Sequence, residues 1–274
     1  MAPVLPGPAR RRDIMSSSLR CMAALEKLAR SPYGYTLSEI AAALEVNLTT
    51  THRVLSTLLE SGFIAQDRRD RKYRIAAKLL WVGTAYLRRS SVYLASFAVI
   101  EDLASRSQMM AHVAAWEDNE LFYLHAAGPP DSLNLFSQIG ERIAMHGTGL
   151  GKAVLAWRPE EEFHRLFAAP LERYTEHTIT EPGRMKLELQ RIRKHGYAID
   201  QEESGLGMRC VAAPVRDHSG SVVAAISISA PAIELKDRNI PKYVRHVLEA
   251  SLRISVQLGY RPSSGSLAAG RYRK

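Results

Sequence analysis

The chain has 274 residues, enough for two domains, and its contents of 46% hydrophobic and 24% charged residues are ordinary for a globular protein. The net charge is +9, and residues 1–90 supply most of it, with 15 Lys and Arg against 7 Asp and Glu. A segment with this excess of positive charge is suited to binding a polyanion. The 2 cysteines lie far apart, which argues against a disulfide framework, and no apolar run is as long as a membrane span. We therefore expect a cytoplasmic protein with no membrane partner.

Both ends of the chain are expected to lack fixed structure. Residues 1–16 are rich in Pro, Gly and Arg and have no apolar core, which predicts a flexible basic arm rather than a secretory signal. Residues 261–274 are predicted to be a disordered tail. After the arm, Leu19, Met22, Leu25 and Leu28 share one face of a predicted helix.

Residues 36–75 predict a winged helix-turn-helix. Thr36 and Glu39 have the spacing of a capping box, which starts one helix near Leu37, and Asn47 is a good N-cap for a second helix. After Gly62, a polar tip at residues 66–72 separates two short apolar segments, as expected for a hairpin wing. We assign residues 17–77 to this DNA-binding domain.

The outward face of the second helix is predicted to enter the major groove of duplex DNA. Its small and forked polar side chains suit base edges, and the arginines of the wing suit phosphates. The alternative is a basic surface that serves only solubility. The candidate DNA-binding residues are Ser38, Thr49, Thr50, His52, Arg53, Thr57, Arg68, Arg69, Arg71 and Lys72.

Residues 76–89 are apolar at helical spacing and predict a helix that joins two domains, with the linker at residues 78–91. A second amphipathic helix follows from Val92 to about Ser105. The apolar stripe of a linker helix needs a partner, either its own domain or a second subunit. Because operators read by such motifs usually have two half-sites, we expect a homodimer, or a dimer of dimers.

Residues 92–260 have a mixed α and β pattern. Strands are predicted at residues 109–116, 121–125, 133–138, 197–200, 210–216 and 222–229, and residues 117–120 (EDNE) predict a hairpin turn between the first two. Helices are predicted after the glycine-rich turn at 146–152, after Pro159, over about 181–194 and over about 240–258. The fold class is therefore α+β, with a largely antiparallel sheet in the second domain.

Five motifs in chain order resemble transcriptional regulators of the isocitrate lyase regulator (IclR) type. They are residues 37–41 (LSEIA), 49–53 (TTTHR), 146–153 (HGTGLGKA), 196–203 (GYAIDQEE) and 209–215 (RCVAAPV). The resemblance extends from about residue 17 to 259. It implies an N-terminal winged helix-turn-helix joined by a linker helix to a GAF-like effector-binding domain, which responds to a small metabolite, commonly a carboxylate or aromatic acid. Thr51, where an aliphatic residue is usual, and the arginine-rich wing depart from the pattern.

The second domain is expected to hold the effector. The turn at residues 146–152 directs backbone N–H groups toward a carboxylate, or is simply a tightly packed helix entry; Ala153 rules out a nucleotide P-loop. Ser227 and Ser229 share one face of a strand, which either lines a polar pocket or faces solvent, and the resemblance favours the pocket. The Asp200 carboxylate would repel a ligand carboxylate unless it is protonated or bound to a ligand hydroxyl, which favours a hydroxylated acid as the ligand. The candidate effector-binding residues are Leu135, Ile143, Thr148, Gly149, Leu150, Asp200, Cys210, Ser227 and Ser229.

A cysteine-dependent enzyme is the competing class, with Cys210 as nucleophile and a nearby histidine, for example His146, as base. The spacing of these residues does not demand catalysis, and a strand does not activate a thiol as a helix N-terminus does. The histidines show no metal-ligand spacing, and Glu202 and Glu203 suggest a solvated turn. We therefore expect no catalytic residue, metal or cofactor.

Overall fold

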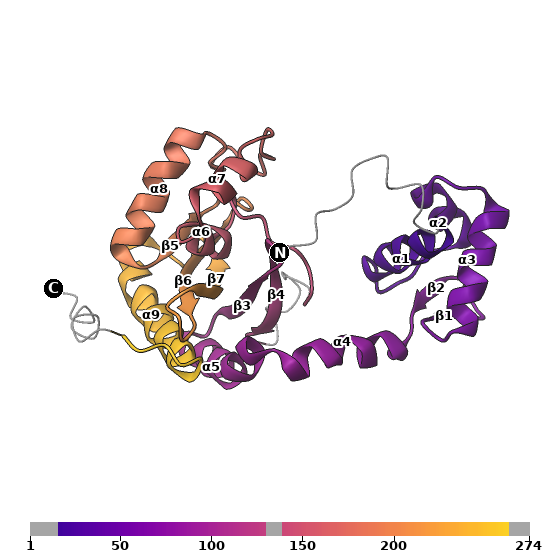
Figure 1. Cartoon of the computed structure of the whole chain (residues 1–274), viewed down its shortest axis with the longest axis horizontal. Coiled ribbons are helices and arrows are strands. Elements are labelled where there is room, and N and C mark those ends of the chain that lie inside the picture. Colours follow the sequence, from indigo (N-terminus) through magenta and orange to yellow (C-terminus); the bar gives the residue numbers. More distant parts are fainter. Residues whose placement is uncertain (1–15, 130–138, 263–274) are drawn as a thin grey trace. The chain divides into compact units, whose positions relative to one another are not determined.

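The computed structural model describes residues 16–129 and 139–262 of the chain. It divides into two compact units that meet between Arg89 and Ser90, and each unit is described by itself (Figure 1). Among the described residues, no helix is both long enough and apolar enough to cross a membrane.

The N-terminal unit contains three helices, a two-stranded hairpin and a fourth helix. The helices are α1 (Ser16–Ala29), α2 (Leu37–Leu44) and α3 (Leu48–Glu60). Both predicted caps are confirmed: Thr36 and Glu39 form a capping box on α2, and Asn47 Oδ1 accepts a hydrogen bond from Thr50 N (2.8 Å) at the start of α3. The helices enclose a small core that includes Ile40 and Leu55.

The buried face of α1 differs from the predicted one. Ala24 and Leu28 are buried, and Cys21 and Leu25 pack against the same core, whereas Leu19 and Met22 are exposed. A small alanine lets α1 approach α2 and α3 closely, and this contact shifts the buried stripe of α1 away from its bulkiest side chains. Periodicity alone did not identify this face.

The wing is an antiparallel pair, β1 (Ile64–Gln66) and β2 (Tyr73–Ile75). Two aspartates order the turn between them: Asp67 Oδ1 accepts a hydrogen bond from Arg69 N (2.8 Å), and Asp70 Oδ1 accepts one from Lys72 N (2.9 Å). Arg74 on β2 pairs with both carboxylates, at 2.9 Å to Asp67 and 2.5 Å to Asp70. The acidic side chains of the wing are thus neutralised within it.

Helix α4 (Ala77–Arg89) follows the wing and has no buried residue among those described. Lys78 secures its first turn, because Lys78 Nζ donates a hydrogen bond to Ser61 O (2.7 Å) and lies over the Phe63 ring. Farther along, Leu80 is 71% exposed and Trp81 is 66% exposed. Within the described part of the N-terminal unit, this apolar surface is exposed.

The C-terminal unit is built on a five-stranded antiparallel sheet of order β4-β3-β7-β6-β5 (Figure 1). The strands are β3 (Met110–Glu117), β4 (Glu120–Ala127), β5 (Ala198–Gln201), β6 (Met208–Arg216) and β7 (Val222–Pro231). The predicted hairpin between β3 and β4 is confirmed, and its central residues Asp118 and Asn119 both have positive φ, as a tight hairpin turn requires. The strand predicted at residues 133–138 lies outside the described residues.

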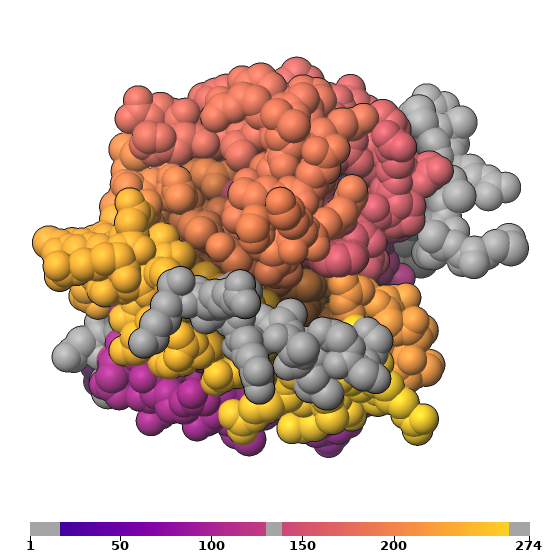
Figure 2. Space-filling model, turned by 90° about the vertical axis from the view of Figure 1, so that its left-hand side faces the viewer, coloured from indigo at the N-terminus to yellow at the C-terminus, as the bar shows by residue number. Residues whose placement is uncertain are grey.

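Helices cover both faces of this sheet. One face carries α6 (Gly149–Leu155), α7 (Glu160–Leu166) and α8 (Pro182–His195), and the other carries α5 (Ser91–Ser107) and α9 (Ile240–Gln257). Figure 2 shows α5, in magenta, beside α9, in yellow, on the surface of this unit. Along β7, Ala225 belongs to the core under α6, and the alternate residues Ile226 and Ile228 are fully buried toward the other face. The α+β prediction is confirmed.

Candidate functional site

The outer face of α3 presents most of the predicted recognition residues to solvent. Thr49, His52, Arg53 and Thr57 are exposed; Thr50 is half-buried, and its N–H donates to the Asn47 cap. The Thr57 hydroxyl donates to Arg53 O (3.0 Å), which turns it toward its own helix. Ser38 is exposed on α2. The Arg53 guanidinium is an exposed forked group on this face.

The wing adds a second basic surface. Arg68, Arg69 and Arg71 are exposed and Lys72 is half-buried. Because Arg74 neutralises Asp67 and Asp70, these four cations remain available to phosphates. The arginines of the wing were predicted from the sequence. The role of Asp67 and Asp70, which shape the turn that presents these arginines, was not predicted.

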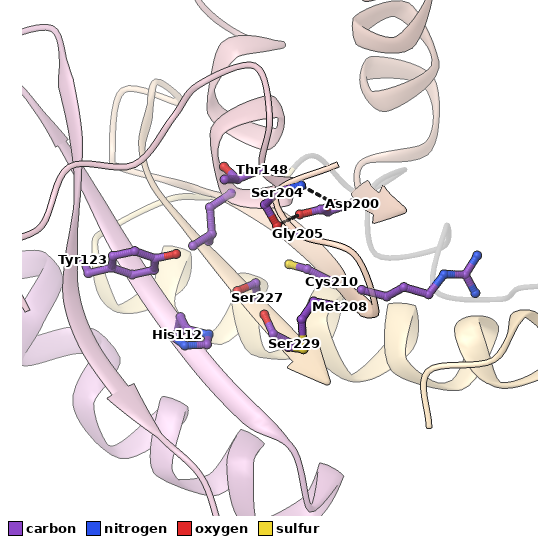
Figure 3. A pocket seen from close by; sticks show the side chains of 13 residues that line it. His112, Tyr123, Thr148, Asp200, Ser204, Gly205, Met208, Cys210, Ser227 and Ser229 are labelled. Carbon is purple, nitrogen blue, oxygen red and sulfur yellow. Dashed lines mark hydrogen bonds between the residues drawn. The ribbon is translucent and has the colours of Figure 1, made fainter. Parts of the chain in front are cut away.

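A cavity of about 250 Å³ opens in the C-terminal unit between the sheet and the start of α6 (Figure 3). It brings together seven of the candidate effector residues. They are Thr148, Gly149, Leu150, Asp200, Cys210, Ser227 and Ser229. Ile143 instead packs in the core with Leu121 and Leu150, because it follows a segment that pairs with the edge of β4. Leu135 lies outside the described residues.

Strand register assembles the floor of this cavity. Asp200 on β5 is opposite Cys210 on β6, and Cys210 is opposite Ser229 on β7. Two residues before Ser229 on β7, Ser227 is opposite His112 on β3. Figure 3 shows the Ser227 and Ser229 hydroxyls, the Cys210 thiol and the His112 ring around one space. Residues from four strands that are distant in sequence therefore form one polar surface.

The sequence analysis missed six residues of the cavity wall, which are His112, Tyr123, Ser204, Gly205, Met208 and Arg209. A signal existed for His112, which is the polar residue inside the apolar segment of residues 110–115. The ring of Tyr123 lies 5.6 Å from that of His112, and its hydroxyl points into the cavity (Figure 3). Sequence spacing does not reveal that β7 is the neighbour of β3.

Helix α6 forms the wall opposite the floor. Thr148 caps it by accepting a hydrogen bond from Gly151 N (2.9 Å). As in any helix, the N–H groups of the first turn, here those of Gly149 and Leu150, have no acceptor inside the helix. A side chain at position 149 would meet Cys210 Sγ at 2.9 Å, and one at 151 would meet Ala144 O at 2.4 Å. Both glycines thus let α6 approach the sheet closely.

Asp200 organises the hairpin loop beside the cavity. Its Oδ1 accepts a hydrogen bond from Glu203 N (2.7 Å), and its Oδ2 accepts one from the Ser204 hydroxyl (2.6 Å). Burial raises the pKa of Asp200, and these hydrogen bonds act in the opposite direction. Much of its hydrogen-bonding capacity is therefore used by its own loop.

Burial keeps the two groups that could drive covalent chemistry neutral. It raises the pKa of the Cys210 thiol to about 12, and the charge of Asp200 acts in the same direction. It lowers the pKa of His112 to about 4. His146 is not among the described residues that line this cavity: its Nε2 lies 2.8 Å from Glu172 O, and its ring stacks on Tyr174. Within the described chain, no three His, Cys, Asp or Glu side chains gather as a metal site.

The expectation of a solvated turn at Glu202 and Glu203 is wrong for Glu203. Its side chain is buried against the ammonium of Lys152, which is itself 1% exposed. Lys152 Nζ also donates to Ile199 O (2.7 Å) and lies 3.4 Å from Glu188 Oε1. The partner of Glu203 comes from a distant helix, so local composition did not reveal it.

Comparisons with known proteins agree with this architecture. Residues 19–68 match the IclR helix-turn-helix domain, and residues 84–256 match the C-terminal domain of bacterial transcriptional regulator IclR. The chain is 30% identical over 249 residues to the HTH-type transcriptional regulator KdgR of Dickeya chrysanthemi, covering 90% of this chain and 81% of that protein.

Solved structures show the same fold. The crystal structure of Thermotoga maritima IclR superposes with a TM-score of 0.75 at 30% identity, covering 90% of this chain and 100% of that one. An IclR homolog from Microbacterium hydrocarbonoxydans, complexed with 4-hydroxybenzoate, has a TM-score of 0.77 at 22% identity and covers 89% of this chain and 99% of its own. The chain belongs to the IclR family of transcriptional regulators, with a DNA-binding helix-turn-helix and a C-terminal effector domain.

Proposed function

We propose that this regulator binds operator DNA through α3 and the wing, and that a small carboxylic acid in the cavity of the C-terminal unit controls this binding. The observation that carries the proposal is the cavity itself, where the first turn of α6 faces a floor of neutral hydroxyl, thiol and imidazole groups. The regulator acts in the cytoplasm. Its domains are residues 17–77 and 92–260, joined by the linker at 78–91.

The DNA contacts follow from exposure and charge. Arg53 and Thr49 on α3 reach base edges, Ser38, Thr50, His52 and Thr57 line the same approach, and Arg68, Arg69, Arg71 and Lys72 bind phosphates. The excess positive charge of residues 1–90 supports this assignment.

The effector is a small organic acid that is aromatic or hydroxylated. The N–H groups of Gly149 and Leu150 offer the seat for the carboxylate. Ser227, Ser229 and Tyr123 offer neutral partners for the rest of the molecule, and a cavity of about 250 Å³ limits its size. The homolog that was crystallised with 4-hydroxybenzoate has a ligand of this class.

A thermal-shift screen of small organic acids tests the effector assignment. A ligand that binds the folded state raises its apparent stability, so an accepted acid should raise the melting temperature of the wild type. The Ser227→Ala/Ser229→Ala variant should lose this shift while it keeps DNA binding without effector. The proposed site is wrong if the double variant retains the full shift.

We further propose that the regulator is a homodimer or a dimer of dimers. The exposed apolar residues Leu80, Trp81 and Val82 of α4 support this assembly, because a large apolar surface on a linker helix needs a cover. Sedimentation of a Leu80→Glu/Trp81→Glu variant should show a shift toward monomer. A mass equal to that of the wild type would exclude α4 as the interface.

We propose that the chain performs no catalysis, against the alternative of a Cys210-dependent enzyme. A thiol with a pKa of about 12 is protonated at neutral pH and is a weak nucleophile. Cys210→Ser should leave DNA binding intact and abolish no turnover, because there is none to lose. Any turnover that this substitution abolishes would support the enzyme.

A further inference from the structure

Lys152 is a buried cation that the effector assignment does not use. It lies on α6, three residues after Gly149, and its side chain extends away from the cavity toward the β5–β6 loop. There its ammonium meets Glu203, Glu188 and the carbonyl of Ile199. Neither Lys152 nor Glu203 is among the described residues that line the cavity.

Glu203 links this cation to the wall of the cavity. Its backbone N–H is held by Asp200 (2.7 Å), and its carbonyl oxygen accepts a hydrogen bond from the Thr178 hydroxyl (2.7 Å). The next two residues, Ser204 and Gly205, line the cavity opposite the floor (Figure 3). The Glu203 side chain therefore faces α6 while its neighbours face the ligand space.

The energetics of such a pair favour a role in geometry. Removing an ammonium and a carboxylate from water costs several kcal/mol, which their attraction offsets only when the geometry and the remaining hydrogen bonds are good. A pair of apolar side chains would fill the same space without this cost. What an ion pair adds is a fixed distance and direction between the elements that carry it.

We propose that the Lys152–Glu203 ion pair positions two walls of the cavity, the first turn of α6 and the loop at residues 200–205, relative to each other. It ties α6 to the loop from behind, so that Gly149 and Leu150 keep a fixed position relative to Ser204 and Gly205 at the edge of the cavity. The consequence for effector affinity rests on the proposed function; the positioning of the walls does not.

Cys210 provides a probe of the walls that needs no knowledge of the effector. Its thiol faces the cavity, is 8% exposed and lies close to Gly149 of α6, so its reaction with iodoacetamide should become faster when the walls separate. In a Cys21→Ser background, the alkylation rate of Cys210 at fixed pH measures this opening. Hydrogen exchange of residues 200–205 gives an independent measure of loop opening.

The decisive variant is Lys152→Met/Glu203→Leu, which removes both charges of the pair, while Glu188 keeps its ion pair with Arg191. The proposal predicts that it folds with a melting temperature near that of the wild type, yet Cys210 reacts faster by about tenfold or more, as expected for more frequent local opening. Lys186→Met, which removes an exposed pair with Glu160, is the matched control and should change neither rate nor stability.

The single variant Glu203→Gln separates positioning from charge burial. It keeps the size of the side chain but leaves Lys152 with weaker compensation, so it should lower stability and speed alkylation together. If the double variant restores both stability and the wild-type alkylation rate, the pair only balances charge and the proposal is overturned.

The same variants separate this proposal from the effector assignment. Binding of 4-hydroxybenzoate, measured by calorimetry, serves as the ligand probe. Fast alkylation in the double variant with no binding of the probe by the wild type would support the positioning role and count against an aromatic acid as effector. Unchanged alkylation would contradict the positioning role whatever the wild type binds.

Discussion

Thr51, Arg53 and Thr57 lie within two turns of α3, yet their surroundings give them different roles. Thr51 is fully buried, and its hydroxyl donates to Asn47 O (3.1 Å), so a polar residue fits where an aliphatic one was expected. Thr57 donates to the backbone of Arg53 (3.0 Å). Arg53 extends into solvent, which makes it the strongest candidate for base recognition.

Arg53→Ala should weaken binding to a selected operator duplex by about 1–3 kcal/mol, roughly tenfold to a hundredfold, without lowering the melting temperature. Fluorescence anisotropy at moderate salt measures the loss. Arg30→Ala, an exposed arginine outside α3 and the wing, is the control. Equal affinities of wild type and Arg53→Ala would remove α3 from the interface as assigned.

His112 should make the C-terminal unit sensitive to acid. The unfolded chain protonates this histidine near pH 6.5, whereas burial holds the folded pKa near 4, so the folded state binds fewer protons between these values. The free energy of unfolding should therefore fall as the pH drops from about 6.5 to about 4, by on the order of 3 kcal/mol from this group. The raised pKa values of Asp200 and Glu203 act in the opposite direction.

Comparison with His112→Gln isolates this contribution. Urea unfolding followed by tryptophan fluorescence should show that the difference in stability between wild type and variant changes across this pH window and is constant above it. A difference that does not vary with pH would mean that His112 is not buried in its neutral form.

At the scale of elements, the features that could be predicted are those set by interactions between residues close in sequence. Thr36, Glu39 and Asn47 act through backbone groups three residues away, so the starts of α2 and α3 could be read from the sequence. The same holds for the β3–β4 turn at Asp118 and Asn119. The buried face of α1 could not be read this way, because the approach of other helices selects it.

Asn47→Ala should lower the stability of the N-terminal unit by about 1 kcal/mol, since the N–H of Thr50 loses its acceptor. Thr51→Val should have a much smaller effect, because Thr51 N still donates to Asn47 O (3.0 Å). Thermal melting followed by circular dichroism compares the two variants. The capping account fails if Thr51→Val is the more damaging change.

The wing should act through charge. Arg69→Ala should reduce the slope of log affinity against log salt by about one, as expected for one lost phosphate contact. Arg74→Ala should also weaken binding, because it leaves Asp67 and Asp70 uncompensated beside the DNA. Anisotropy titrations at several salt concentrations measure both. An unchanged slope in Arg69→Ala would exclude this residue from the phosphate contacts.

At the scale of the whole molecule, the sequence predicted the order of the elements and the fold class but only part of the cavity. Thr148, Gly149 and Leu150 are contiguous, and Ser227 and Ser229 lie on one strand, so local patterns found them. His112, Tyr123 and Ser204 join them through the sheet order β4-β3-β7-β6-β5, which no local pattern encodes. The burial of Lys152 against Glu203 depends on the same long-range arrangement.

The regulator is a switch only if occupancy of the cavity changes affinity for DNA. Coupling of this kind amounts to about 1–3 kcal/mol in typical allosteric proteins, and it is reciprocal. The most direct measurement is the anisotropy of a selected operator duplex with the wild type and with Ser227→Ala/Ser229→Ala, titrated with an acid from the thermal-shift screen. We expect a shift of roughly fivefold or more in the wild-type DNA affinity and none in the variant. An acid that binds the cavity and leaves DNA affinity unchanged would contradict it.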